Sequence, residues 1–269
     1  MSKRIFKFSW RQLVSALALT SIAASPCAAQ DSAFGSDDAN AALIGILYDL
    51  KQTQKGDPSG VGVQEYPLVL SEFMESDWDE AVLNRFFRVS RPVYASKVFV
   101  PMMSAGQAPK AFRVDEVVDP RLIVVHYKGQ VVAPMDGVYR LAGFADDFIA
   151  ARVNGDTVLV AGRGDCLSPI TFPWEAKVPD GFPIGNGRVR FGNWFAVRKG
   201  EAIDLDVLIG ERPGGDFGAW LYIERKGESY PAGEGSPLLP VFQFAEDVGR
   251  ITGGRHAEPR ESSVWKAVQ

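Results

Sequence analysis

The sequence predicts a mainly β protein, an antiparallel β-sandwich with a short helical extension at its N-terminus. From Ser96 onward the chain is a series of short runs rich in branched and aromatic residues. Gly, Pro, Asn and Asp separate these runs, and no helical periodicity lies between them, which favours an antiparallel sandwich. In residues 202–209 the side chains at 203, 205, 207 and 209 are apolar, and two of the three between them are Asp. This period-two pattern is typical of a half-buried strand.

Residues 1–29 are organised as a secretory signal peptide. Four Lys and Arg side chains precede an apolar run at 13–24, and small residues at 27–29 come before Gln30. An apolar run of about 12 residues is too short to cross a bilayer as an ordinary helix. Pro26 directly before Cys27 disfavours a lipoprotein signal. We expect cleavage after Ala29, no transmembrane segment, and export to the periplasm, cell surface or extracellular space.

The mature chain is expected to be acidic. Removing residues 1–29 lowers the 29 Lys and Arg to 25 and leaves all 33 Asp and Glu, so the formal net charge goes from −4 to −8. Nucleic acids and anionic membranes need clustered positive charge, so this composition disfavours both as partners. Cations and neutral molecules remain possible ligands.

The number of cysteines indicates that the mature protein is stabilised by a hydrophobic core and not by disulfides. After cleavage Cys166 is the one remaining thiol, so no intramolecular disulfide is possible. A free cysteine is usually buried and behaves as a small hydrophobe, which is what we expect of Cys166. The full chain is 46% apolar, ample for a core.

Residues 30–92 are predicted to form the helical extension. Asp37 opens a helix over 37–54 at the positive end of the helix dipole, apolar residues follow at helical spacing, and Gly56 ends it. A shorter helix is predicted at 79–89. Helices of these lengths are not stable alone, so both should dock on other elements.

The sandwich is predicted to span residues 93–247. Its expected strands are 97–100, 121–127, 130–133, 137–144, 148–153, 157–160, 194–198, 202–209 and 218–224. The Gly- and Pro-rich stretch 162–193, which contains Trp174, is expected to be a long loop over the sandwich, and such loops often carry function. Few apolar residues occur in 248–269, so a disordered tail is expected there.

An adjacent acidic pair, Asp146 and Asp147, lies between the strands at 137–144 and 148–153, at the mouth of the hairpin that these strands are expected to form. Carboxylate oxygens are the ligands that Ca²⁺ prefers. Two neighbouring carboxylates also repel each other, so the pair gains nothing electrostatically without a metal or hydrogen-bond donors. In the alternative interpretation both side chains are solvated and shape a turn.

The sequence contains no recognisable catalytic constellation. Its two histidines are His126, in an apolar strand and expected to be a hydrogen-bonded core residue, and His256, in the expected tail. Neither a Ser-His-Asp order, a Cys-His nucleophile signature nor zinc-ligand spacing is present. A glycosidase needs only two carboxylates, which cannot be picked out among 33 acidic residues. We therefore expect a protein that is not an enzyme.

Three groups of motifs follow one another over residues 97–225. They are Tyr127-Lys-Gly129 with Gly137-Val-Tyr139; Gly143-Phe-Ala-Asp-Asp-Phe148 with Asn154-Gly155; and Lys199-Gly-Glu201 with Pro213-Gly-Gly-Asp-Phe-Gly218 and Ala219-Trp-Leu-Tyr222. In this order they resemble the PA-fourteen family, the protective-antigen-type, jelly-roll-like β-sandwich found in toxins, yeast flocculin lectins and some glycoside hydrolases. The resemblance covers about half of the mature chain.

The resemblance implies a calcium site. In the lectin members of the family a pair of Asp residues joined by a cis peptide holds Ca²⁺, and sugar hydroxyls complete the metal's shell; Asp146 and Asp147 match that pair. A later loop usually supplies an Asn ligand, and the matching segment here offers Asp216 instead. Trp174 is a further candidate for contact with the ligand.

Two functions follow from these expectations. The first is an exported, non-catalytic module for Ca²⁺-dependent recognition of a carbohydrate or a cell-surface protein. The alternative is a structural or assembly protein of the cell envelope, in which the Asp pair only shapes a loop and the helices engage a partner.

We predict that the mature protein begins near Gln30 and carries a single thiol. Intact-mass measurement and thiol counting on protein exported by its own host test this. Retention of residues 1–29, or acylation at Cys27, would contradict it.

Overall fold

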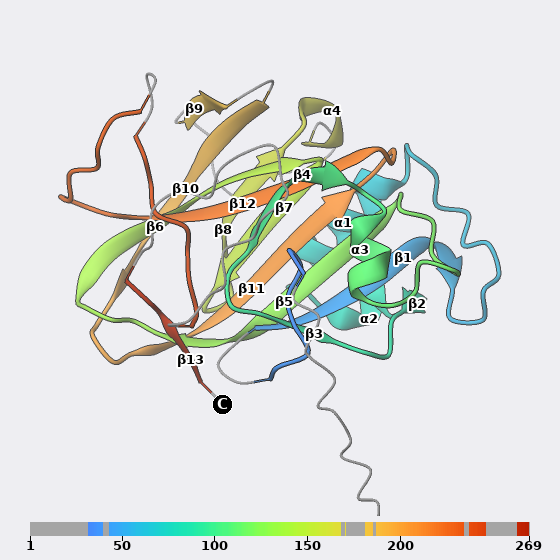
Figure 1. Ribbon diagram of the computed structural model, residues 1–269, viewed down its shortest axis with the longest axis horizontal. Coiled ribbons are helices and arrows are strands. Elements are labelled where there is room, and N and C mark those ends of the chain that lie inside the picture. The colour runs from blue at the N-terminus through green and yellow to red at the C-terminus, as the bar shows by residue number, and fades with distance from the viewer. Residues whose placement is uncertain are drawn as a thin grey trace, which may run out of the picture.

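Two antiparallel sheets face each other and enclose the main hydrophobic core (Figure 1). The computed structural model describes residues 32–39, 43–167, 170, 181–184, 187–233, 237–245 and 263–268. Trp174 and the expected signal peptide lie outside these residues. The mainly β, sandwich-type fold class predicted from the sequence is confirmed.

The larger sheet has eight strands within the described residues. They are β1 (Leu43–Thr53), β2 (Phe86–Arg88), β3 (Val93–Ala95), β5 (Ile123–Val132), β7 (Phe148–Val153), β8 (Asp156–Gly162), β11 (Ala202–Glu211) and β13 (Lys266–Val268). The strand order is β2-β1-β5-β11-β7-β8, with β13 also paired to β5 and β3 to β1. The strand β11 therefore runs between β5 and β7, in the interior of the sheet.

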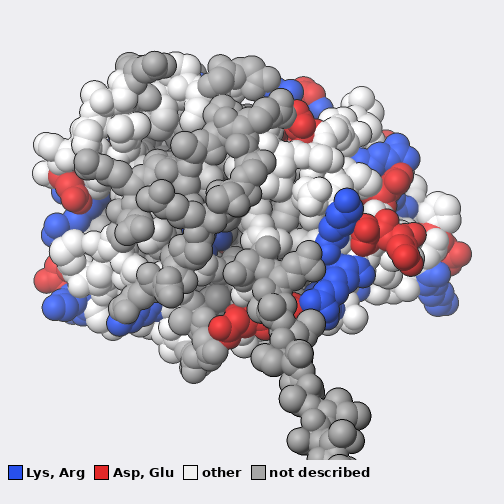
Figure 2. Space-filling view, in the orientation of Figure 1, with Lys and Arg blue, Asp and Glu red and all other residues white. Residues whose placement is uncertain are grey.

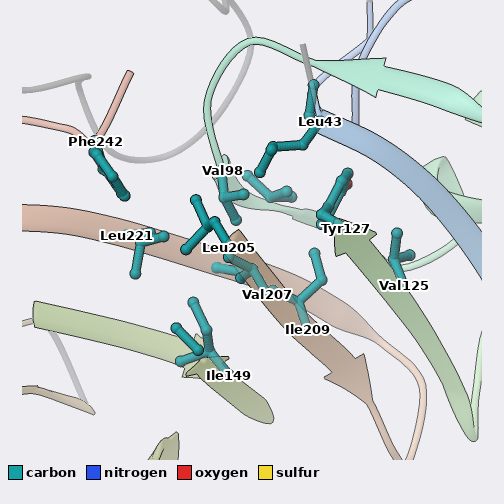
Figure 3. Close-up of a cluster of buried hydrophobic side chains, with 14 of the residues drawn as sticks. Leu43, Val98, Val125, Tyr127, Ile149, Leu205, Val207, Ile209, Leu221 and Phe242 are labelled. Atoms are coloured by element: carbon teal, nitrogen blue, oxygen red, sulfur yellow. The ribbon is translucent and has the colours of Figure 1, made fainter. Parts of the chain in front are cut away.

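The smaller sheet has five strands within the same residues. They are β4 (Phe99–Ser104), β6 (Gly137–Asp146), β9 (Gly181–Ile184), β10 (Gly187–Val197) and β12 (Asp216–Arg225). Their order is β4-β12-β6-β10-β9. Inward-facing side chains of both sheets, such as Leu205, Ile149 and Leu221, interdigitate in the core (Figure 3).

Short helices cover the outer face of the larger sheet. The described helices are α1 (Tyr66–Glu75), α2 (Glu80–Leu83), α3 (Gln107–Ala111) and α4 (Gly164–Leu167). Buried residues of α1, α2 and α4 form a second apolar cluster with the outward-facing side chains of β1, β5, β7 and β11. Cys166 lies in this cluster as a free, buried thiol, as expected. None of the helices in the described residues has the length and apolarity needed to cross a membrane.

The helix predicted at 37–54 was wrong, because the structure places the eleven-residue strand β1 there. Leu47 points into the core between the sheets, whereas Ile46 and Tyr48 pack into the outer cluster. A strand buried on both faces has nearly continuous apolar residues, and such a run can also match helical spacing. Helices do occur in the N-terminal region, but the ten-residue α1 was not predicted.

Three other predicted boundaries differ from the structure. The helix expected at 79–89 is limited to the four residues of α2, capped by Asp79, whose Oδ1 accepts a hydrogen bond from Ala81 N at 2.9 Å; β2 follows. The expected loop at 162–193 contains α4, β9 and the first part of β10. The expected tail includes β13 and the buried Trp265; its residues 248–262 lie outside the described part.

His126 is a satisfied core residue, as predicted. Its side chain is 3% exposed, and its Nε2 lies 2.9 Å from Asp206 Oδ1. Arg152 Nε binds the other carboxylate oxygen of Asp206 at 3.1 Å, and the Arg152 guanidinium also binds the carbonyl of Asp77 at 2.5 Å. This chain of contacts joins the turn after α1 to β7 and β11.

We predict that Leu47→Ala lowers the free energy of unfolding by about 3 kcal/mol, because Leu47 is fully buried and truncation leaves a cavity. Leu68→Ala on α1, where the side chain is 53% exposed, is the matched control and should change stability by less than about 0.5 kcal/mol. Urea unfolding measures both; equal effects would show that β1 is not part of the core.

Candidate functional site

The acidic pair lies where the chain crosses from one sheet to the other. Asp146 is the last residue of β6 in the smaller sheet, and Asp147 leads into β7 of the larger one. The peptide bond between them is cis, as the resemblance implied. The loop from β11 to β12 makes the reverse crossing beside it, since Asp147 N donates to Gly210 O at 3.0 Å.

A third segment, at the end of β8, contacts the acidic pair. Arg163 N donates to the carbonyl oxygen of Asp147 at 2.9 Å. Gly162 has a φ of +141°, and a Cβ at this position would lie 2.0 Å from the same carbonyl oxygen. Glycine is therefore required at 162 for this close approach.

The Asp147 carboxylate is buried and held from two sides. The residue is 3% exposed, and its Oδ2 accepts a hydrogen bond from Arg212 N at 2.9 Å. Arg163 Nε lies 3.0 Å from Asp146 Oδ1 and 3.7 Å from Asp147 Oδ1. Burial raises the pKa of Asp147 to about 6, and the charge of Asp146 adds to the rise against the opposing effect of the Arg212 N–H.

Glu211 is a third carboxylate beside the pair, which sequence reasoning missed. It is 1% exposed; its Oε1 accepts a hydrogen bond from Gly214 N at 2.7 Å, and its buried Oε2 has no hydrogen-bond partner among the described residues. Burial, and then the charge of Asp147, raise the pKa of Glu211 to about 9. One signal could have identified it: Glu211 continues the odd-numbered, core-facing series of β11 that includes Leu205 and Ile209.

Asp216, the third ligand that the resemblance suggested, is the first residue of β12, at the end of the loop that leads from β11. It is exposed and lies opposite Ser104 of β4. Among the described residues no group of three or more His, Cys, Asp or Glu side chains is arranged to hold a metal ion. The role of Asp216 therefore stays a prediction.

The donor set at this edge suits a hard cation. Asp146 and Asp147 offer carboxylate oxygens, the ligands that Ca²⁺ prefers. With Glu211 they do not make a complete metal-binding group in the described residues, so backbone carbonyls, water or a bound ligand would supply the rest of the six to eight oxygens that Ca²⁺ takes. The Oε2 of Glu211, which has no hydrogen-bond partner among the described residues, is a buried oxygen of the kind that a cation would satisfy. The second nearby guanidinium, that of Arg212, is engaged elsewhere, in an ion pair with Asp165.

No protein-family model and no curated protein match this sequence. Among solved structures, the chain is similar to the PA14 sugar-binding domain from an RTX adhesin, with 14% identity, a TM-score of 0.44, and 76% of this chain and 96% of that chain covered. The PA14 domain of the MpAFP antifreeze protein has 14% identity, a TM-score of 0.43 and coverage of 76% and 87%.

A third similar structure is the epithelial adhesin 6 A domain from Candida glabrata in complex with Galb1-3GlcNAc. Its identity is 10%, its TM-score 0.40, and 83% of this chain and 93% of that chain are covered. Two of these three structures are thus PA14 domains, the type that the sequence motifs resemble. Identities of 14% or less and TM-scores below 0.5 leave the ligand to be argued from the residues of this chain.

We expect the metal-free protein to lose stability as the pH rises through the titration of Asp147. Its folded-state pKa of about 6 lies above the usual 3.8, so the folded protein binds more protons between these pH values and the free energy of unfolding falls across them. At about 1.4 kcal/mol per pKa unit, the difference between about 6 and 3.8 makes this loss on the order of 3 kcal/mol.

Asp147→Asn removes this titration and should therefore stabilise the protein at pH 7.5 but not at pH 4. Urea unfolding in chelator at both pH values is the measurement. The same change in stability at both pH values would contradict a raised pKa.

Proposed function

We propose that this chain is an exported, non-catalytic module that binds Ca²⁺ at Asp146 and Asp147, next to Glu211, and recognises a carbohydrate or another cell-surface component there. One observation carries the proposal: buried carboxyl groups converge where two chain crossings meet, and one of their oxygens has no hydrogen-bond partner among the described residues. Burying ionised carboxylates that face one another is unfavourable unless opposite charge compensates them, and the raised pKa values of Asp147 and Glu211 reflect that cost. A divalent cation would supply that charge.

The roles of the residues follow from their exposure. Asp147 and Glu211 are buried and would contribute oxygen ligands from the core side. Because burial raises the pKa of Glu211 to about 9, Glu211 would have to release its proton when it binds the metal. The Asp146 side chain is 13% exposed, so it lies nearest to solvent and to an incoming ligand. When bound, Ca²⁺ supplies open coordination positions that sugar hydroxyls can fill. Asp216 and Trp174 remain candidates for further contacts.

The same burial argues against an enzyme. A glycosidase acid must reach the glycosidic oxygen within hydrogen-bond distance, which side chains 1% and 3% exposed do not readily do. His126 is engaged with Asp206 in the interior, and burial raises the pKa of the Cys166 thiol to about 12. Neither side chain is therefore available as a base or a nucleophile.

The net charge fits a neutral ligand better than a nucleic acid. The full chain has 29 Lys and Arg against 33 Asp and Glu. On the face seen in Figure 2, Lys and Arg side chains of the described residues have Asp and Glu side chains nearby. A nucleic-acid surface would need clustered positive charge to neutralise phosphates.

A second function is favoured by the contacts of the pair itself. Arg163 and the Arg212 N–H already engage the Asp146 and Asp147 carboxylates. If these contacts suffice, the pair only fastens the crossing loops, and the protein is a structural or assembly component of the cell envelope.

A Ca²⁺ titration separates the two functions. A ligand that binds only the folded state stabilises it by about 2.7 kcal/mol at a concentration of 100 Kd, so millimolar Ca²⁺ should raise the melting temperature. Asp147→Asn should weaken this response, whereas Asp156→Asn, a control at the exposed start of β8, should not.

Binding to a glycan array should be lost with chelator and with Asp147→Asn. A wild-type protein whose melting temperature is the same in millimolar Ca²⁺ and in chelator would instead support the structural function.

A further inference from the structure

We propose that Arg163 is a tethered cation that bridges Asp146 and Asp147 in the metal-free protein and is exchanged for Ca²⁺, so that the metal competes with the protein's own guanidinium. This inference rests on the proposed calcium site. In this exchange, a side chain of the protein itself regulates how readily the site binds Ca²⁺.

The Arg163 guanidinium lies close to both Asp carboxylates, where a cation shared by the two would have to bind. Arg163 Nε is within 3.0 Å of Asp146 Oδ1 and 3.7 Å of Asp147 Oδ1, so one positive group faces an oxygen of each carboxylate. The other oxygen of Asp147 is occupied by the Arg212 N–H at 2.9 Å. Binding of a metal to both Oδ1 atoms would therefore require the Arg163 side chain to leave.

The backbone of Arg163 is fixed while its side chain can move. Its N–H binds the Asp147 carbonyl at 2.9 Å, and its own carbonyl accepts from Cys166 N at 3.0 Å and Leu167 N at 3.1 Å. The side chain, by contrast, is 43% exposed. The guanidinium can thus swing into water without unfolding the segment that carries it.

Arg212 lacks this freedom. Its side chain is only 12% exposed and is paired with Asp165, so its guanidinium has another partner and little access to water. At the pair it acts through its backbone N–H. Of these two arginines, Arg163 is the one built to be exchanged.

One guanidinium does not satisfy the whole acidic edge. Among the described residues, the buried Oε2 atom of Glu211 has no hydrogen-bond partner even with Arg163 at the pair. A divalent ion brings twice the charge and accepts more oxygen ligands than a guanidinium offers donors to these carboxylates. Replacing the Arg163 guanidinium by Ca²⁺ therefore compensates more of the negative charge of the carboxylates, although the ion pair of Arg163 is lost.

Competition should weaken Ca²⁺ binding and set a concentration threshold. Below the threshold the arginine holds the two crossings together, so the site keeps its shape without metal. Extracellular calcium modules work at about 10⁻⁴–10⁻³ M, a range that suits an exported protein with such a competitor.

The test compares Arg163→Gln with Arg163→Lys, which keeps the charge, and with Arg85→Gln as a matched control. Arg85 is 49% exposed and paired with Glu72 at 2.6 Å; it directly precedes β2, at the opposite edge of the larger sheet from β7 and β8. All proteins are purified in Ca²⁺, stripped with chelator, and titrated calorimetrically with CaCl₂. Thermal unfolding is recorded with and without the metal.

We expect Arg163→Gln to lower the Ca²⁺ dissociation constant about two- to fivefold, which is the scale of one partly exposed ion pair that no longer has to be broken. In chelator the same variant should melt below the wild type, and Ca²⁺ should restore it. Arg163→Lys should bind Ca²⁺ more weakly than Arg163→Gln, and Arg85→Gln should match the wild type.

Two results would overturn the exchange, and they are distinguishable. Equal Ca²⁺ affinities in the wild type and Arg163→Gln would remove the competition and leave the proposed calcium site standing. An absence of Ca²⁺ binding in every protein, Arg163→Gln included, would remove the calcium site and the exchange together.

Discussion

The strand β11 is the constraint on which the rest of the structure depends. It is hydrogen-bonded to β5 on one side and to β7 on the other, and both of its faces are buried. Its core-facing side chains fill the space between the sheets, and on the outer face the backbone at Gly210 makes room for Tyr66, since a Cβ there would lie 2.1 Å from the Tyr66 hydroxyl. Its register therefore positions both the opposite sheet and α1.

The candidate site is a direct consequence of where β11 ends. Gly210 O receives the Asp147 N–H, Glu211 extends the core-facing series by one further position, and Arg212 N binds the Asp147 carboxylate. Three successive residues thus place an accepting carbonyl, a buried acid and a donor around the pair. The site is shaped by backbone groups of a central strand, which are harder to displace than loop side chains.

The sequence predicted those strands whose residue pattern fits only one type of secondary structure. Alternation located β11, and the turn residues placed Asp146 and Asp147 between two strands. The hairpin expected there was wrong, because β6 and β7 belong to different sheets and the chain crosses between them at the pair. The strand β1 was mistaken for a helix because apolar contacts on both faces erase the alternation. Glu211 was missed because its importance depends on burial at the end of a strand, and Arg163 because its contact with the pair joins segments that only the fold brings together.

The pairing of β13 has a practical consequence for orientation. Lys266 is opposite Val132 of β5, and Val132 is also opposite Ala202, the first residue of β11, whereas the acidic cluster lies at the last residue of β11. Ten residues of strand, roughly 30 Å at about 3.3 Å each, separate the two ends of the sandwich. The strand β13 accordingly lies at the opposite end of the sandwich from the acidic cluster (Figure 1). A biotin or a bead linker attached beyond β13 would leave the acidic end facing outward, toward a glycan-bearing surface.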